Sequence, residues 1–179
     1  MTLLFGRTYQ IPVVALRYFN VYGTRQSLSN PYTGLCAIFS SRLLNDKTPL
    51  VFEDGEQTRD FVHVSDIVQA NLLAIEKADA AYEAMNIGTG IATTVNQMAK
   101  LLSHGLGKNI PAEITGQYRE GDIRHCVADI SKAKRLLGYA PKVALQDGLR
   151  ELLAWVGRQS AEDHVSQMQN ELATRNLVY

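Results

Sequence analysis

The sequence is poor in cysteine and histidine, and it has no excess of charge of either sign. Two cysteines and four histidines occur among 179 residues, without the spacing of metal ligands. Cys36 and Cys126 could pair, but two cysteines in a chain of this size give no disulfide framework, so we expect a reducing cytoplasm. Basic and acidic residues number eighteen each, which argues against a nucleic-acid-binding or anionic-membrane surface.

Long apolar runs and leader segments are also missing. No apolar run approaches membrane-spanning length, and Met1–Thr8 has too short an apolar core for a signal peptide. These first residues instead resemble the end of a helix. The sequence contains no internal repeats and no low-complexity segments. Its length is sufficient for one domain with a sizeable core.

The first apolar run predicts a strand of a parallel sheet. Val13–Leu16 follows Pro12 and is closed by Arg17, a pattern typical of a strand buried on both faces. The upstream residues, roughly a dozen, are too few for the crossover connection that an adjacent parallel strand requires. We therefore expect the chain to begin in mid-domain, with one side of this strand open.

Apolar periodicity and capping residues predict the remaining elements. Short strands are expected at residues 50–52, 61–64, 85–87 and 112–115, and a loop at residues 24–34. Helices are expected through residues 37–44, from Asp129 to Gly138 and through residues 149–156. A further helix is expected to be capped by Ser65 or Asp66, with Val68, Leu72 and Ile75 facing a core. Another is expected to begin with a capping box at Thr94–Gln97 and to have an apolar face made of Val95, Met98, Ala99 and Leu102. The polar tail after Ser160 is expected to be a helix extension or a loosely packed end.

Arg59 lies between a predicted turn at Asp54-Gly55 and a predicted strand. Its planar guanidinium, held at such a position, suits an anionic ligand because it can donate two parallel hydrogen bonds to one phosphate or carboxylate. The alternative is an ion pair with Asp60 or Asp54 on a solvated surface, which would be of little consequence.

Four stretches, in this order, resemble motifs of one enzyme family: Leu16–Gly23, Asp54–Val64, Asn86–Gly90 and Arg119–His125. They are similar to motifs of the NAD-dependent nucleotide-sugar epimerase/dehydratase family, the extended short-chain dehydrogenases that include UDP-glucose 4-epimerase. The resemblance covers the chain from about Thr8 to Val156. It implies an α/β fold: the C-terminal portion of a Rossmann-like parallel sheet plus a small mixed α/β substrate-binding domain, with the N-terminal dinucleotide-binding half absent. The expected units are residues 1–160 and a C-terminal tail, residues 161–179.

Two hallmarks of the family are not found. Gly88-Thr89-Gly90 lacks the third glycine of a dinucleotide-binding loop and is better interpreted as a tight strand-to-helix turn. None of the eight tyrosines has a lysine four residues later, and Tyr139 has Lys142 only three residues later. The chain is therefore expected to lack the main NAD half-site and the Tyr-x-x-x-Lys acid-base pair. No catalytic residue and no metal ligand is assigned.

The resemblance assigns substrate-binding roles to residues of the remaining part. It places Asn20 against the nucleotide-sugar and Phe52 against the base. It also implies that Phe19 borders the nicotinamide of NAD, although simple core packing would explain this phenylalanine equally well. Asn20 follows a predicted buried strand, and the carboxyl ends of parallel strands are where α/β folds bind ligands.

Three charged residues complete the implied site. Arg59 and Arg119 match the arginines that clamp the diphosphate in the family, and Asp122 matches the acid that accepts hydrogen bonds from the ribose. The chemistry agrees, since two arginines can neutralise a diphosphate and a carboxylate accepts from vicinal hydroxyls. We assign no catalytic role to His63, which is interpreted as a structural histidine, or to His125, which belongs to a binding motif.

The leading hypothesis is therefore the nucleotide-sugar-binding half of an NAD-dependent epimerase or dehydratase, with a UDP- or dTDP-sugar as ligand and no turnover by this chain alone. The alternative is a truncated, non-catalytic module that binds nucleotide-sugars weakly or only packs against a partner. Residues 30–35 depart from the pattern of many epimerases, which leaves the sugar and the choice between epimerase and dehydratase open. The open strand predicts a homo-oligomer, swapped or symmetric, or a missing N-terminal half as partner.

Overall fold

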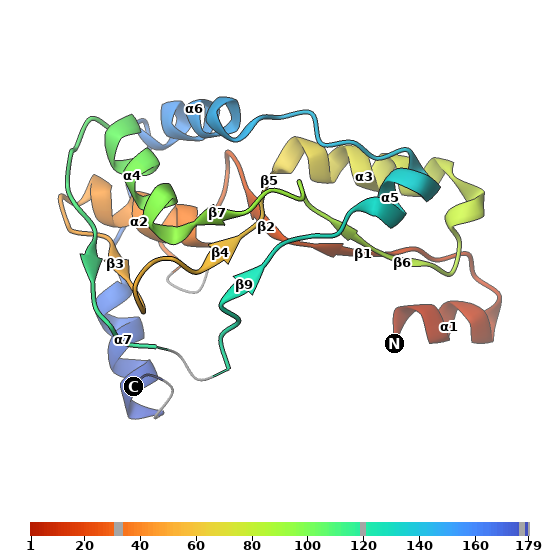
Figure 1. Ribbon diagram of the computed structural model, residues 1–179, viewed down its shortest axis with the longest axis horizontal. Coiled ribbons are helices and arrows are strands. Elements are labelled where there is room, and N and C mark those ends of the chain that lie inside the picture. The colour runs from red at the N-terminus through yellow and green to blue at the C-terminus, as the bar shows by residue number, and fades with distance from the viewer. Residues whose placement is uncertain (31–33, 119–120, 176–177, 179) are drawn as a thin grey trace.

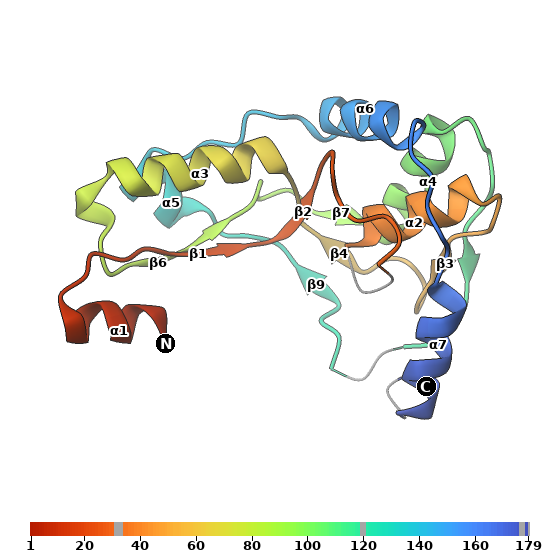
Figure 2. The same cartoon turned by 180° about the vertical axis from the view of Figure 1, so that it is seen from behind.

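The computed structural model describes residues 1–30, 34–118, 121–175 and 178. The molecule is elongated, with the first and last helices at opposite ends (Figures 1 and 2). Its helices are α1 (Thr2–Tyr9), α2 (Leu35–Leu44), α3 (Val64–Glu76), α4 (Val95–Gly105), α5 (Ser131–Leu137), α6 (Leu145–Val156) and α7 (Val165–Thr174), with a 3-10 turn, η1, at Ala78–Ala80. Its strands are β1 (Ala15–Tyr18), β2 (Asn20–Tyr22), β3 (Leu50–Val51), β4 (Thr58–Arg59), β5 (Phe61–His63), β6 (Ala84–Ile87), β7 (Thr93–Thr94), β8 (Glu113–Ile114) and β9 (His125–Cys126).

Parallel pairing dominates between these strands. β1 pairs with β6, β2 with β5 and β3 with β8, all parallel. β4 pairs in parallel with β9 and antiparallel with β7. Helices connect the paired strands, as parallel pairing requires. The expected α/β class, with Rossmann-like parallel strands and a smaller mixed part, is confirmed.

The first strand differs from its prediction. It runs from Ala15 to Tyr18 rather than through Val13–Leu16, and Arg17 and Tyr18 are exposed instead of buried on both faces. The reason is that β1 pairs with β6 on one side only, and the described residues supply no strand for its other edge. The expectation of an open side is met at this edge.

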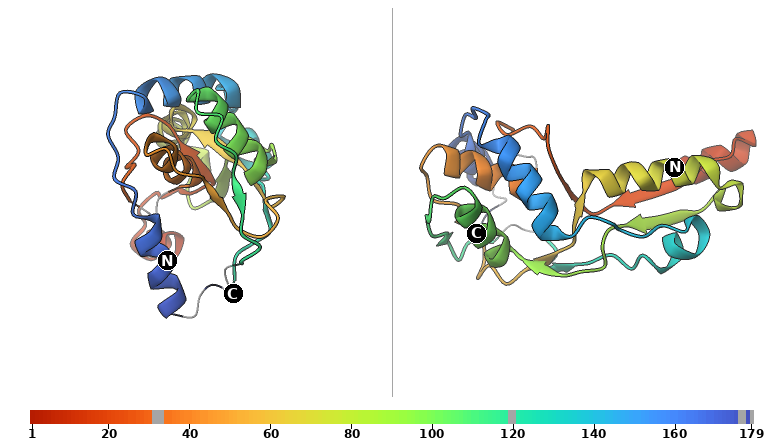
Figure 3. Two further views of the ribbon diagram at one scale, coloured as in Figure 1. Left: turned by 90° about the vertical axis from the view of Figure 1, so that its left-hand side faces the viewer. Right: turned by 90° about the horizontal axis from the view of Figure 1, so that it is seen from above.

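Two hydrophobic clusters form the core. One lies where α2, α4 and α6 come together, with Phe39, Met98 and Leu152 among its buried side chains. The other lies at β6, α3 and α5 and includes Met85 and Leu137. Burial of each such side chain stabilises the fold by about 1.5–3 kcal/mol relative to exposure. The left panel of Figure 3 shows α4 and α6 together at one side of the molecule.

Helix α4 agrees with its prediction in both its cap and its buried face. Thr94 Oγ1 accepts from the backbone N–H of Gln97 at 3.1 Å, and the Gln97 side chain accepts from the N–H of Thr94 at 3.0 Å. This reciprocal pair satisfies N–H groups that a helix start otherwise leaves without partners. The four residues predicted for its apolar face are buried: Val95, Met98, Ala99 and Leu102.

Helix α3 contradicts the predicted orientation of its apolar side chains. Val68, Leu72 and Ile75 are 53%, 56% and 82% exposed, although they were expected to face a core. Ile67 and Ala70 are buried instead. Periodicity identifies residues that share a helix face, but the covering partner decides which face is buried, and no described element covers this one.

The predicted caps of α3 are also wrong. The helix begins at Val64, and the preceding His63 is the cap, its Nδ1 accepting from Ser65 N–H at 3.4 Å. Asp66 is buried and accepts from the backbone N–H groups of Lys142 and Val143 at 2.8 and 3.2 Å. A carboxylate that holds a distant loop in this way is not available as a helix cap.

The C-terminal elements largely follow the predictions. Asp129 accepts from the N–H of Ser131 at 2.9 Å at the start of α5, and Gly138, with φ 70°, ends that helix. α6 buries Leu149, Leu152 and Val156. α7 is a separate helix rather than an extension of α6. The boundary between residues 1–160 and 161–179 stays a prediction.

Cys36 and Cys126 are both free thiols. The described residues contain no group of histidine, cysteine or carboxylate side chains that could hold a metal ion. Within the same residues, every helix is too short or too polar to cross a membrane.

Candidate functional site

A cavity of about 260 Å³ lies between α2, the segment from β3 to β4, and α7. Four of the residues predicted to bind substrate line it: Asn20, Phe52, Arg59 and Asp122. They come from three segments of the chain: β2, the segment from β3 to β4, and the loop before β9. Phe19 does not line the cavity and is partly buried against the second core cluster, while Arg119 lies outside the described residues.

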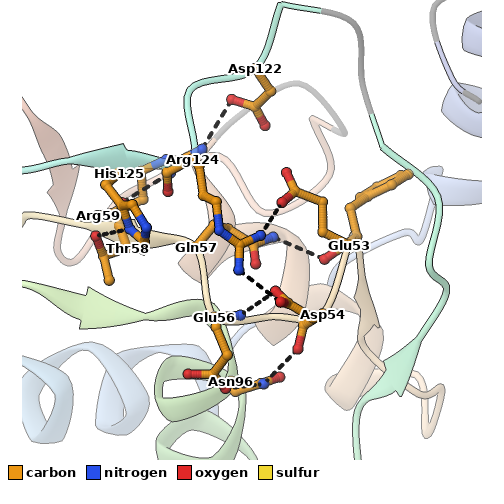
Figure 4. A network of polar contacts seen from close by, with 11 residues as sticks. Glu53, Asp54, Glu56, Gln57, Thr58, Arg59, Asn96, Asp122, Arg124 and His125 are labelled. Atoms are coloured by element: carbon orange, nitrogen blue, oxygen red, sulfur yellow. Dashed lines mark hydrogen bonds and ion pairs between the residues drawn. The ribbon is translucent and has the colours of Figure 1, made fainter.

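Hydrogen bonds from both terminal nitrogens hold the guanidinium of Arg59. Nη1 donates to the carbonyls of Thr58 and Arg124 at 2.9 and 3.0 Å, and Nη2 donates to Asp122 Oδ1 at 3.0 Å (Figure 4). Its side chain is only 15% exposed, whereas that of Asp122 is 46% exposed. The carboxylate partner is thus Asp122, and neither Asp54 nor Asp60, the partners considered for a surface ion pair.

Arg124 fixes the turn that precedes β4. Its two terminal nitrogens donate to Glu53 Oε2 at 2.6 Å and Asp54 Oδ2 at 2.7 Å (Figure 4). The hydrogen bond from Arg124, followed by one from the N–H of Glu56, holds the pKa of the Asp54 carboxyl below its ordinary value. At Gly55, with φ 78°, a side chain would collide with Asn96, so this turn requires glycine.

Asp60, next to Arg59, is a fully buried carboxylate. It accepts from the N–H of Thr89 at 2.8 Å, the hydroxyl of Thr89 at 2.6 Å and the N–H of Gly90 at 2.8 Å. The N–H of Ala128 adds a fourth contact at 3.2 Å. Because Asp60 already holds the N–H groups of Thr89 and Gly90, this turn does not fit a cofactor pyrophosphate. The turn is structural, as the sequence indicated, but it leads into the strand β7 and not directly into a helix.

The two histidines near the site have structural contacts. His63 is buried beside the ring of Tyr22, with ring centroids 5.4 Å apart, and its Nε2 lies 3.7 Å from Glu151 Oε2. His125 is exposed, and its Nδ1 lies 3.0 Å from the hydroxyl of Thr58. Neither lines the cavity.

Sequence reasoning missed several residues that line the cavity. Gln57 donates from Nε2 to the carbonyl of Phe52 at 2.9 Å and thereby fixes the segment that carries Phe52. Arg42, on α2, donates from Nε to the carbonyl of Thr48 at 2.6 Å. Gln57 belongs to a motif that was noticed, but α7 gave only the weak signal of apolar residues scattered in a polar tail.

Comparison with known proteins adds an independent result. Residues 1–88 match the model of the NAD dependent epimerase/dehydratase family. A putative UDP-glucose 4-epimerase of Methanocaldococcus jannaschii is 39% identical over 153 residues, 86% of this chain and 48% of the relative. A dTDP-L-rhamnose 4-epimerase of Burkholderia thailandensis is 36% identical over 148 residues, 83% of this chain and 40% of the relative.

Solved structures agree with these sequence matches. The UDP-glucose 4-epimerase of Thermotoga maritima with UDP-glucose superposes with a TM-score of 0.77 at 44% identity, covering 85% of this chain and 48% of that one. The UDP-glucuronic acid 4-epimerase of Bacillus cereus, with UDP-glucuronic acid and NAD, superposes with a TM-score of 0.76 at 33% identity. The match covers 86% of this chain and 48% of that one.

Parallel strands, a cavity lined by arginine, asparagine and aromatic side chains, and these matches together define an α/β protein of the short-chain dehydrogenase type. The chain belongs to the NAD-dependent epimerase/dehydratase family. NAD is the cofactor of this family. The chain spans about half the length of the curated relatives it matches.

Proposed function

We propose that this chain binds the nucleotide-sugar in an NAD-dependent sugar epimerase or dehydratase, with a UDP-sugar as the leading substrate. The observation that supports this most strongly is the convergence of Asn20, Phe52, Arg59 and Asp122 on one cavity. These are an amide, an aromatic ring, a cation and an acceptor, the groups that a sugar, a base, a diphosphate and a ribose require.

Arg59 is suited to the diphosphate because its guanidinium is already positioned by two backbone carbonyls. A bound diphosphate would compete with Asp122 for Nη2 of Arg59. The displaced carboxylate could then accept hydrogen bonds from the ribose hydroxyls. Arg119, placed by its motif three residues before Asp122, would supply the second positive charge.

The uncharged groups would orient the two ends of the ligand. Phe52 would pack against the base, and Asn20, whose backbone N–H donates to the carbonyl of Asp60 at 2.9 Å, would contact the sugar. Phe19 would border the nicotinamide of NAD held by residues elsewhere. Binding contacts far from the reacting carbon would thereby orient that carbon for oxidation at C4.

A second candidate is a non-catalytic module that binds nucleotide-sugars weakly or only packs against a partner chain. The edge of β1 that no described strand pairs with and the exposed apolar residues of α3 favour it, because both surfaces invite association. The genomic sequence upstream of Met1 separates the two. A reading frame with a Gly-rich turn and Tyr-x-x-x-Lys favours the enzyme.

Calorimetric titration of the chain with UDP-glucose and UDP tests the leading proposal. We expect Arg59→Ala and Arg119→Ala each to weaken binding roughly ten- to a hundredfold, as expected for loss of charge-assisted hydrogen bonds worth about 1.5–3 kcal/mol. Arg135→Ala, at an exposed arginine of α5 that does not line the cavity, is the matched control and should bind as the unaltered chain does.

The outcomes separate the alternatives. Loss of binding in both arginine variants, with the control unaffected, supports the nucleotide site. Undiminished binding by Arg59→Ala would contradict the assigned clamp. A folded chain that binds neither ligand would contradict nucleotide-sugar binding by these residues on their own.

A further inference from the structure

The C-terminal helix α7 supplies part of the cavity wall. Val165, Met168 and Gln169 line the cavity together with Phe52 and Arg59. The last family motif in this sequence ends at His125 and the resemblance ends near Val156, so neither gives a role to this helix. In the left panel of Figure 3, α7 (blue) lies apart from the strand β8 (green). Residues of α2 line the same cavity.

A buried carboxylate fixes the start of α7 to the end of α2. The side chain of Asp163 is 1% exposed, and its Oδ2 lies 2.9 Å from Lys47 Nζ and 3.3 Å from Arg42 Nη1. Its Oδ1 accepts from the N–H of Val165 at 3.1 Å, at the first turn of α7. One carboxylate therefore bridges the two helices that border the cavity.

Backbone contacts of the preceding residues strengthen this attachment. Ser41 Oγ donates to the carbonyl of Glu162 at 3.2 Å, and Asn45 Nδ2 donates to the carbonyl of Ala161 at 2.8 Å. The N–H of Glu162 donates to Ser29 Oγ at 3.2 Å. With these bonds and the burial of Val165 and Met168, α7 is a docked part of the fold.

The α7 wall differs chemically from the wall that carries Arg59 and Asp122. Val165 and Met168 are apolar and buried, and Gln169 is a partly buried, uncharged amide. A glutamine side chain offers a donor and an acceptor side by side, which complements the adjacent N–H and C=O groups of a pyrimidine base. Phosphates would find no positive charge on this helix wall, whereas an uncharged ring fits it.

We propose that α7 is part of the nucleotide site, with Gln169 as a specificity residue that hydrogen-bonds the base and Asp163 as the positioning residue that fixes the helix. This inference rests on the proposed function, because it assigns one part of the same ligand to one wall of the same cavity. It extends the site to a segment outside the stretch that resembles the family.

Calorimetry with UDP, UDP-glucose and inorganic pyrophosphate tests the assignment on the full chain. Gln169→Ala is expected to weaken the binding of UDP and of UDP-glucose equally, by about five- to tenfold, which is the loss typical of one or two hydrogen bonds. The affinity for pyrophosphate should not change. Gln167→Ala is the matched control, since it removes an exposed glutamine from the same helix and does not line the cavity.

Asp163→Asn provides the second variant. Removing the charge weakens the link to Arg42 and Lys47, so we expect weaker UDP binding. Pyrophosphate binding should not weaken, because Arg42 lines the cavity and loses a neutralising partner. A merely structural role would lower thermal stability without changing the preference for UDP over pyrophosphate.

The inference and the proposed function can fail separately. If UDP binds and Arg59→Ala abolishes binding while Gln169→Ala binds normally, the role of α7 is overturned and the nucleotide site stands. If Gln169→Ala weakens the binding of UDP-glucose but not of UDP, the glutamine contacts the sugar and the assignment to the base is overturned. If the unaltered folded chain does not bind UDP, both proposals are wrong.

Discussion

Two neighbouring residues, Arg59 and Asp60, illustrate how differently adjacent charges can be used. Arg59 reaches the cavity, whereas Asp60 is buried and holds Thr89, Gly90 and Ala128 by hydrogen bonds. β5, which follows Asp60 directly, is thereby tied to the turn after β6. The position of Arg59 depends on this anchor, since Asp60 fixes the chain one residue further on.

Replacing Asp60 with asparagine should therefore destabilise the fold strongly. The amide cannot accept from all of the buried donors, and we expect a loss of about 2–4 kcal/mol in the free energy of unfolding. Urea unfolding followed by circular dichroism measures it. Asp79→Asn, at an exposed aspartate of η1, is the control and should change stability by less than about 0.5 kcal/mol. Equal unfolding free energies for both variants would contradict this role of Asp60.

The candidate site was predictable where a motif marked it. Asn20, Phe52, Arg59 and Asp122 were named from resemblance to a family, and the structure brings them to one cavity. Gln169 could not be found in this way, because the tail carries no motif and its apolar residues are too few to show a clear helical face. Nor did the sequence indicate that Asp60 is buried, since an aspartate beside an arginine is usually on the surface.

At the level of elements, α4 and α3 show the strength and the limit of periodicity. α4 has a capping box and an apolar stripe that points into the core, so local sequence and tertiary packing agree. α3 also has an apolar stripe, but Val68, Leu72 and Ile75 face outward. Local sequence identifies both helices, whereas the presence of a covering partner is a property of the surroundings.

The outward stripe of α3 leads to a prediction about association. We expect the chain to self-associate as its concentration rises, and the double variant Leu72→Gln, Ile75→Gln to shift it toward monomer, because less apolar surface is then exposed. Sedimentation velocity over a range of concentrations measures this. Ile91→Gln changes another exposed apolar residue, 67% exposed, away from α3 and should not alter association. A compact monomer at every concentration of the unaltered chain would speak against it.

At the level of the whole molecule, the proposed binding of a nucleotide-sugar can be tested separately from catalysis. The described cavity offers the groups that we propose to bind a nucleotide-sugar, but the 179 residues contain no tyrosine with a lysine four positions later. Under the proposed function, oxidation at C4 would therefore require an acid-base pair that this sequence does not supply.

We accordingly expect no measurable conversion of UDP-glucose to UDP-galactose when the chain is mixed with UDP-glucose and NAD. Chromatographic separation of the two sugars, with an intact relative as positive control, would detect it. Turnover that disappears in Arg59→Ala would show that an acid-base pair does lie within these residues, and the assignment of roles would have to change.

The strand pairing also limits the rate of folding. Between the described strands, each pairing joins segments far apart in the sequence, as with Ala15 beside Ala84 or Thr58 beside His125, and no two successive strands pair. Such contacts form only after long loops have closed, which for topologies rich in non-local pairing takes roughly milliseconds to seconds. Strand edges stay open to other chains during that interval. The yield on refolding therefore depends on whether strands pair within one molecule before they associate with strands of other molecules. Dilution favours pairing within one molecule.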